Sequence, residues 1–448
     1  MTSLAAFMTS LDNTVVNVAL PAIQRDLGLT LAGLEWVVTG YILAFAGLLL
    51  TGGRLADRHG RDRAFLAGTA LFTAASLAAG LAPTASLLLA ARIVQGAGAA
   101  LVLPATLAIL ATDLTARARL HGFALWTAAV AVSLALGPLV GGALSQHAHW
   151  SWIFLVNVPA GAVTLLVARH ALPRADVEAR RLDLPGLVTS AIALTAATYV
   201  LVQGHEHGWT ATAILVAAAI AVTAALAFAA VESRAPDPLI DLALFRAPAF
   251  GGGIAITILS GLGVNGIFFF TALVLQTVLG LSPTETGLAF VPIALCVAAA
   301  TPLAPYLARR WGTRPTVTAG LLLLAAGLAG AAAAGRDEGV PGLLIPFAAV
   351  GMGSALTAPL TAVVLETVPT ARAGTASGLL SVAREISGVV GIGVIGAVVA
   401  TRQAAARHTG TPVPDALMSG YSAGLALAAV LVLAGAAISV ATLRSPPR

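Results

Sequence analysis

Lysine is missing from this sequence, and charged residues of any kind are scarce. All 24 basic residues are arginine, and charged residues make up only 10% of the 448 positions. Soluble domains carry about 25% charged residues, so the composition argues against a soluble protein. Because a phosphate-binding P-loop requires its lysine, an ATPase of that type is excluded. The single cysteine, Cys296, cannot form a disulfide within the chain.

Long apolar runs recur along the whole chain, and hydrophobic residues make up 58% of it. Unbroken runs of about 18 residues or more predict membrane-spanning helices, whereas barrel strands show short alternating segments. We therefore expect an all-α polytopic membrane protein. Fourteen helices are predicted at approximately 4–23, 34–53, 64–82, 85–111, 122–145, 152–172, 186–204, 211–231, 250–279, 286–308, 315–334, 341–366, 373–400 and 420–443.

The arginines give the predicted orientation. If the segment around Asp57 is cytoplasmic, most arginines outside the helices fall on the cytoplasmic side, as the positive-inside rule requires. The outer side then holds only Arg25, Arg336, Arg402 and Arg407. Both termini are expected to be cytoplasmic, and a cytoplasmic membrane of a bacterium is the expected location.

A short basic sequence occurs twice. LADRHGRDR runs from Leu55 to Arg63, and LARRWGTRP runs from Leu307 to Pro315. Internal repeats in such an apolar chain are typical of two-lobed transporters. The copies lie about 250 residues apart, which at roughly 30 residues per span and loop corresponds to eight spans rather than six. Two extra helices are therefore expected between two six-helix lobes.

This spacing predicts three parts. An N-terminal six-helix lobe covers 1–172, and a C-terminal six-helix lobe covers 250–448. Between them, residues 173–249 hold two linkers and two extra transmembrane helices at about 186–204 and 211–231. Proline and mixed charge mark PRADVEARRLDLPG and ESRAPDPLIDLALFRAP as the linkers.

The first copy of the repeat is the strongest local signal. A tight link between two helices needs the backbone freedom of Gly53 and Gly60. Asp57 lies among arginines and could form a charged latch with them on the cytoplasmic face. Arg58 and Arg61 are the nearest candidates. The alternative is a segment that is basic only because it is cytoplasmic.

Four stretches together resemble the motifs of the major facilitator superfamily, and in particular its fourteen-span drug:proton antiporter family. They are the segment from Gly53, LLLAARIVQGAGAALVLPA (Leu87 to Ala105), SLALGPLVGGAL (Ser133 to Leu144) and LDNTVVNVALP (Leu11 to Pro21). The resemblance covers nearly the whole chain. It implies a major facilitator fold and proton-coupled export.

Asp12 lies about halfway along the first predicted span. Acids at that depth face a cavity or a partner, and burial favours their protonated form. Asp12 is therefore the candidate for proton coupling, and it could also attract a cationic substrate. The alternative is a structural acid, satisfied by Thr9, Asn13 or another helix.

Arg92 is also too deep in its span to reach water, so it needs a partner acid or carbonyls. The resemblance implies a role for Arg92 in proton transfer, with a structural clamp as the alternative. Glu385, in the thirteenth span, could be a second protonation site or a site that recognises cations.

Gly137, Pro138, Gly141 and Gly142 lie in the fifth span. Proline removes a backbone hydrogen bond and glycine thins the helix, so a kink and close helix contact are expected. The resemblance associates this pattern with antiporters. Ordinary packing of small residues is the alternative reading.

Together these features predict an antiporter that exports amphipathic or cationic drugs, antibiotics or related small molecules by alternating access, driven by the proton gradient. Nutrient uptake by proton symport and a non-transporting sensor are the alternatives. No enzyme is expected, because no reactive constellation is present. No cofactor, metal site or nucleic-acid partner is expected either; the histidines of GHEHGW (Gly204 to Trp209) fall short of a ligand set. The expected partners are protons, a small-molecule substrate and the lipid bilayer, with the protein as a monomer.

Overall fold

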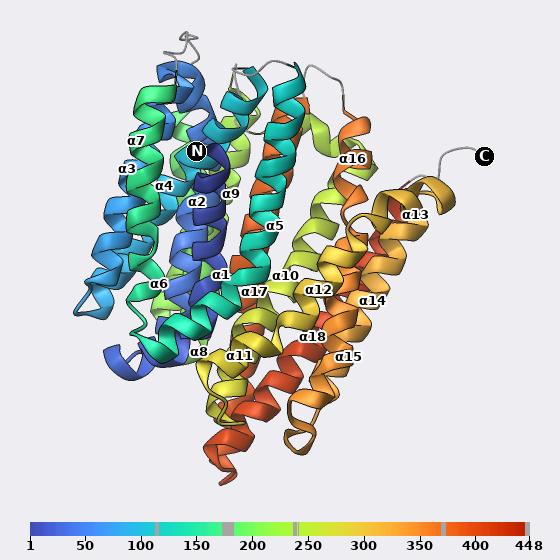
Figure 1. Cartoon of the computed structure of the whole chain (residues 1–448). Helices are drawn as coiled ribbons and strands as arrows, with labels where there is room; N and C mark the ends of the chain where they lie inside the picture. The colour runs from blue at the N-terminus through green and yellow to red at the C-terminus, as the bar shows by residue number, and fades with distance from the viewer. Residues whose placement is uncertain (113–115, 173–182, 236–239, 241, 369–372, 444–448) are drawn as a thin grey trace. The chain divides into compact units, whose positions relative to one another are not determined.

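The computed structural model of the chain is built from helices, and its described residues contain no β-strand (Figure 1). The structure describes residues 1–112, 116–172, 183–235, 240, 242–368 and 373–443. Residues 173–182 of the first predicted linker, and residues 236–239 and 241 of the second, therefore lie outside the described residues. The all-α fold predicted from the apolar runs is confirmed.

The first half of the chain holds nine helices in its described part. They are α1 (Thr2–Leu27), α2 (Leu31–His59), α3 (Arg61–Gly80), α4 (Ala85–Thr112), α5 (Ala116–His147), α6 (Trp152–Leu155), α7 (Asn157–Ala171), α8 (Leu184–His207) and α9 (Thr212–Glu232).

The second half contains several helices that are interrupted. The elements are η1 (Leu242–Arg246), α10 (Pro248–Thr277), α11 (Pro283–Ala289), α12 (Val291–Ala300), α13 (Leu303–Trp311), α14 (Thr313–Ala333), η2 (Arg336–Glu338), α15 (Gly339–Leu356), α16 (Pro359–Glu366), α17 (Ala373–His408) and α18 (Val413–Thr442). Pro292, Pro302 and Pro359 lie at or next to the interruptions, where proline cannot donate the backbone hydrogen bond of a continuous helix.

Thirteen helical segments of the described chain are long and apolar enough to cross a membrane. All fourteen predicted spans are helical, but α1 is not among the thirteen. Its middle carries Asp12, Asn13 and Asn17, which lower its mean hydropathy. The polar residues that make α1 a candidate functional element thus also weaken it as an apolar span.

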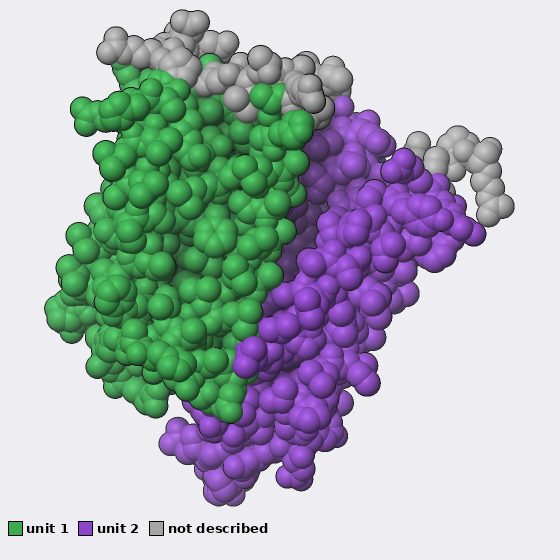
Figure 2. All heavy atoms as spheres, in the orientation of Figure 1, with its two compact units in different colours: residues 1–195, 221–239, 282–287 green, residues 196–220, 240–281, 288–448 purple. Residues whose placement is uncertain are grey.

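The chain divides into two compact units, coloured green and purple in Figure 2. Unit 1 comprises residues 1–195, 221–239 and 282–287. Unit 2 comprises residues 196–220, 240–281 and 288–448. The partition of the chain into lobes at 172 and 250 stays a prediction.

The two units pair their helices in the same order. In unit 1, α1 packs on α5, α2 on α4, α3 on α4, and α3 on α7. In unit 2, α10 packs on α17, α12 on α15, α14 on α15, and α14 on α18. This matched pairing agrees with the internal repeat seen in the sequence.

The repeated basic segments share one backbone conformation. Gly60, between α2 and α3, has φ 97°, and Gly312, between α13 and α14, has φ 93°. Side chains other than hydrogen rarely tolerate such angles, so glycine is required at both helix junctions. Gly53 does not share this role: it lies inside α2, as does Asp57. Only Gly60 separates α2 from α3. The prediction that the junction also uses the backbone freedom of Gly53 was wrong, because Gly53 is helical.

Candidate functional site

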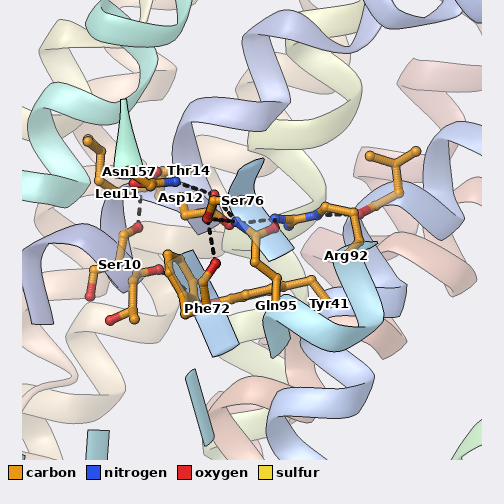
Figure 3. Close-up of polar contacts among 12 residues, drawn as sticks. Ser10, Leu11, Asp12, Thr14, Tyr41, Phe72, Ser76, Arg92, Gln95 and Asn157 are labelled. Carbon is orange, nitrogen blue, oxygen red and sulfur yellow. Dashed lines mark hydrogen bonds and ion pairs between the residues drawn. The ribbon is translucent and has the colours of Figure 1, made fainter. Parts of the chain in front are cut away.

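Asp12 is completely buried in α1, at 0% exposure. Its Oδ2 accepts a hydrogen bond from Arg92 Nη1, and the two side chains form an ion pair. Its Oδ1 accepts from Gln95 Nε2 and from Asn157 Nδ2, each at 2.8 Å (Figure 3). Three donors therefore surround one carboxylate, an arrangement that stabilises its charged form.

Arg92, on α4, is also 0% exposed. Its Nε donates to the backbone carbonyl of Val37 at 2.9 Å, and its Nη1 also donates to Gln95 Oε1 at 2.8 Å. The guanidinium carbon lies 4.4 Å from the ring centroid of Tyr41 and 5.6 Å from that of Phe154. Aromatic faces attract a cation, so α2 and α6 help to hold the charge in place.

Gln95 connects this ion pair to α3. Its Nε2 donates both to Asp12 and to Ser76 Oγ, the latter at 2.8 Å. Ser76 Oγ in turn donates to the backbone carbonyl of Phe72 at 2.8 Å. Because Arg92 and Gln95 are three residues apart, they share one face of α4 and reach the same carboxylate.

The Asp12 network consists of Asp12, Arg92, Gln95, Ser76 and Asn157. It joins α1, α3, α4 and α7 by hydrogen bonds between side chains. The aromatic and backbone contacts of Arg92 add α2 and α6. A buried pair becomes costly when one partner is lost, because the other charge stays behind without compensation. This network can therefore respond to the gain or loss of a single proton.

Sequence reasoning selected Asp12 and Arg92 separately, and the structure brings them together. It did not select Asn157, Ser76 or Glu35. Asn157 is 2% exposed, and Glu35 of α2 is 0% exposed. A polar residue at each of these positions within or beside an apolar run was the available signal.

Glu385 lies outside this network, in α17 of unit 2. Its side chain is half-buried, and among the described residues none forms a hydrogen bond or ion pair with its carboxylate. The charge that acts on it most closely is Arg384, which is exposed. Its role as a second protonation or recognition site stays a prediction.

The segment that is predicted to be cytoplasmic lies at the junction of α2 and α3. Asp57 and Arg58 are exposed in the last turn of α2, and Arg61 is the first residue of α3. Gly60 forms the single-residue junction between them, and Gly53 lies two turns earlier in α2. The latch between Asp57 and these arginines stays a prediction.

The glycines of the fifth predicted span all lie where another chain segment approaches closely. A Cβ atom on Gly137 would overlap the side chain of Thr14, and one on Gly141 would overlap the carbonyl of Val15. Both contacts are with α1, less than one turn after Asp12. Pro138 lies inside α5, and the kink expected there stays a prediction.

The start of α11 packs on the same motif within unit 1. A Cβ on Gly142 would overlap the carbonyl of Pro283, and one on Gly287 would overlap the carbonyl of Pro138. The backbone N–H of Thr284 also donates to Gln146 Oε1 at 3.0 Å. The close contact expected from these glycines is therefore present on two sides of α5.

α11 begins with a capping box, in which Ser282 and Glu285 satisfy each other's backbone groups. Ser282 N–H donates to Glu285 Oε2 at 2.8 Å, and Glu285 N–H donates to Ser282 Oγ at 3.3 Å. This cap fixes the helix start that meets α5.

Among the described residues, no group of three or more His, Cys, Asp or Glu side chains could hold a metal ion.

Comparisons with known proteins agree with this architecture. The chain is 40% identical over 399 residues to the cephamycin export protein CmcT of Amycolatopsis lactamdurans, covering 87% of this chain and 82% of the relative. It is 36% identical over 419 residues to the multidrug resistance protein Stp of Mycobacterium tuberculosis (strain CDC 1551 / Oshkosh), covering 92% and 78%.

A solved structure shares the fold at low sequence identity. A bacterial homologue of the human lysosomal transporter Spinster superposes with a TM-score of 0.65 at 18% identity, covering 100% of this chain and 98% of that one. The profile of the Major Facilitator Superfamily matches residues 2–392. With its helical membrane fold, its repeated basic segment and these relatives, the chain belongs to the Major Facilitator Superfamily of membrane transporters, and it is not an enzyme.

Proposed function

We propose that this transporter exports antibiotics or other amphipathic small molecules from the cytoplasm, and that protons entering through Asp12 drive the export. The names of the relatives support the export of drugs, because one exports cephamycin and another confers multidrug resistance. They differ in breadth, so the substrate class proposed here is amphipathic small molecules rather than one compound. The proposed location is the bacterial cytoplasmic membrane, with both termini inside.

The observation that carries proton coupling is the complete burial of Asp12 against Arg92. While Asp12 is charged, the pair is electrically balanced inside the protein. Protonation leaves Arg92 without its counter-charge in a low-dielectric environment, where the attraction it loses is large. The network must then rearrange, and this gives the proton a means to change the conformation.

The packing of α1 supplies a route from the proton site to the antiporter motif. Thr14 and Val15 follow Asp12 by less than one turn and contact Gly137 and Gly141 of α5. A helix face formed by glycines allows a second helix to approach closely. A shift of α1 on protonation therefore acts directly on α5, and through it on the first turn of α11. We propose that this contact couples protonation to alternating access.

The test uses everted membrane vesicles with an imposed proton gradient that is followed by a pH-sensitive dye. Addition of a transported drug should dequench the dye in wild type, because exported substrate exchanges for protons. Asp12→Asn should show no dequenching. Asp12→Glu keeps the carboxyl group and should retain part of the activity. Asp337→Asn removes an exposed acid from η2 and serves as the control.

The outcomes separate the alternatives. Dequenching by Asp12→Asn equal to that of wild type, at equal protein level, would overturn proton coupling through Asp12. Accumulation of the compound inside intact cells would indicate proton symport instead of export.

A further inference from the structure

We infer that Asn157 is a positioning residue that follows the protonation state of Asp12 by turning over its side-chain amide. The inference rests on the proposed function, in which Asp12 carries the proton. Asn157 is the first residue of α7 and is 2% exposed. Its Nδ2 donates to Asp12 Oδ1 at 2.8 Å (Figure 3).

The charged form of Asp12 is contacted by donors alone. Arg92 Nη1, Gln95 Nε2 and Asn157 Nδ2 each point a hydrogen at a carboxylate oxygen. A protonated carboxyl group carries an O–H donor and needs an acceptor. An acid proton in any of these three positions would meet another donor hydrogen. Oδ1 already accepts two hydrogen bonds, so one of these two contacts must change when Asp12 binds a proton at Oδ1.

Neither Arg92 nor Gln95 is suited to make that change. Arg92 has no acceptor atom. Gln95 Oε1 already accepts from Arg92 Nη1, and its Nε2 also donates to Ser76 Oγ, both at 2.8 Å. A half-turn of the Gln95 amide would disrupt both of these contacts. Ser76 Oγ is occupied as well, because it also donates to the Phe72 carbonyl.

Asn157 is held by fewer contacts. Its Nδ2 makes one hydrogen bond, to Asp12, and no residue in the described part of the chain donates to its Oδ1. A half-turn exchanges Nδ2 and Oδ1 with almost no change in shape, since the two ends of an amide are nearly alike in size. The amide thus donates a hydrogen bond to charged Asp12 and accepts a hydrogen bond from the O–H of neutral Asp12. α7 remains bonded to α1 in both states.

The other charged and titratable groups around this pair come from two helices. α4 contributes Arg92, and α2 contributes Tyr41, whose ring faces the guanidinium. α2 also carries Glu35, which is buried elsewhere along the same helix. No described residue of α5, α6 or α7 brings a charged side chain within ion-pair distance of Asp12. The response of Asn157 is therefore assigned to the proton on Asp12.

Infrared difference spectroscopy of the purified full-length protein between acidic and alkaline pH tests the inference. The carbonyl band of protonated Asp12 is identified by its loss in Asp12→Asn. Wild type should also show a shift of a side-chain amide carbonyl on protonation, and both Asp12→Asn and Asn157→Leu should abolish that shift. Thr164→Val, which removes another buried polar group from α7, is the control and should leave it unchanged.

Asn157→Asp gives a second measurement with the shape of the side chain preserved. Two facing carboxyl groups share a proton, so the Asp12 titration should move to higher pH by about one unit or more, a tenfold change in proton affinity. An unmoved titration in Asn157→Asp, or a wild-type amide shift in Asn157→Leu, would overturn the inference. Absence of any Asp12-dependent carboxyl band would instead overturn the proposed function.

Discussion

The ring of Tyr41 faces the guanidinium of Arg92, with its centroid 4.4 Å from the guanidinium carbon. The Tyr41 hydroxyl donates to the carbonyl of Thr9 at 3.3 Å. Thr9 lies one turn before Asp12 on α1. One aromatic side chain of α2 therefore contacts the helices that carry both members of the buried ion pair. This relationship makes the two functions of Tyr41 separable by substitution.

Tyr41→Phe keeps the ring and removes the hydroxyl, so we expect a loss of about 1 kcal/mol of stability and near-normal transport. Tyr41→Leu also removes the cation–π contact, which is worth about 2 kcal/mol or more when desolvated, and transport should fall sharply. Thermal unfolding in detergent and drug efflux from intact cells measure the two effects. Equal efflux by the two variants would show that the ring does not position Arg92.

Neutralising one or the other partner of the ion pair should change the pH dependence of stability in different ways. Arg92→Gln leaves Asp12 without its counter-charge, so folded Asp12 retains a proton that the unfolded chain releases more readily. Stability of this variant should therefore fall as pH rises. Asp12→Asn leaves a guanidinium that cannot lose its proton, so its penalty, about 3 kcal/mol or more, should not depend on pH in this way.

Melting temperatures at several pH values, each referred to wild type at the same pH, measure this difference. The double variant Asp12→Asn/Arg92→Gln should lose less stability than the sum of the single variants, because no uncompensated charge remains. Additive losses would show that the two charges do not interact as the geometry indicates.

Gly142→Ala and Gly287→Ala should both impair transport and lower stability by about 1–3 kcal/mol, because the added methyl group overlaps a backbone carbonyl that cannot move independently. Gly47→Ala is the matched control. Gly47 also lies in an apolar helix, but a Cβ there meets no atom within 4 Å. Vesicle transport and melting temperature are the measurements. Wild-type stability and transport in Gly142→Ala would show that the close contact between α5 and α11 is not required for either.

The two helix junctions should be sensitive to alanine in the same way. Gly60→Ala and Gly312→Ala place a side chain at φ 97° and 93°, and the strain should cost about 1–3 kcal/mol. Gly53→Ala should be neutral or stabilising, because Gly53 is helical and its Cβ would contact Pro104 Cβ at an ordinary 3.8 Å. Expression level and melting temperature distinguish these cases. A loss of melting temperature in Gly53→Ala as large as that in Gly60→Ala would contradict an ordinary helical conformation at Gly53.

Long apolar runs and repeated glycines made the helical fold predictable. The run lengths placed the spans, and the Leu55 and Leu307 segments indicated the repeat that reappears as matched helix pairing. Helix ends were less predictable, because charged residues do not end a helix by themselves. α2 continues through Asp57 and Arg58 to Gly60, where the backbone conformation terminates it.

The site was predictable only one residue at a time. Depth within an apolar run identified Asp12 and Arg92, because a charged side chain at that depth is costly unless it has a partner or faces a cavity. Their pairing depends on how α1 and α4 pack against each other. The spacing of residues along one helix does not show which other helix it will contact. Asn157 was not predicted because it is uncharged, and an uncharged residue within an apolar run does not require an ionic partner. Only its distance to Asp12 reveals its place in the network.

Charge is divided unequally between two units that pair their helices alike. Unit 1 buries Asp12, Arg92 and Glu35 completely, whereas the described part of unit 2 holds no charged side chain buried to that degree. The network that we propose to couple export to protons therefore lies in unit 1. Substitutions in the interior of unit 2 leave the ion pair intact, so this half is freer to diversify. If Asp12 and Arg92 couple export to protons as proposed, a change of substrate specificity that leaves this coupling intact is expected to arise in unit 2 rather than in unit 1.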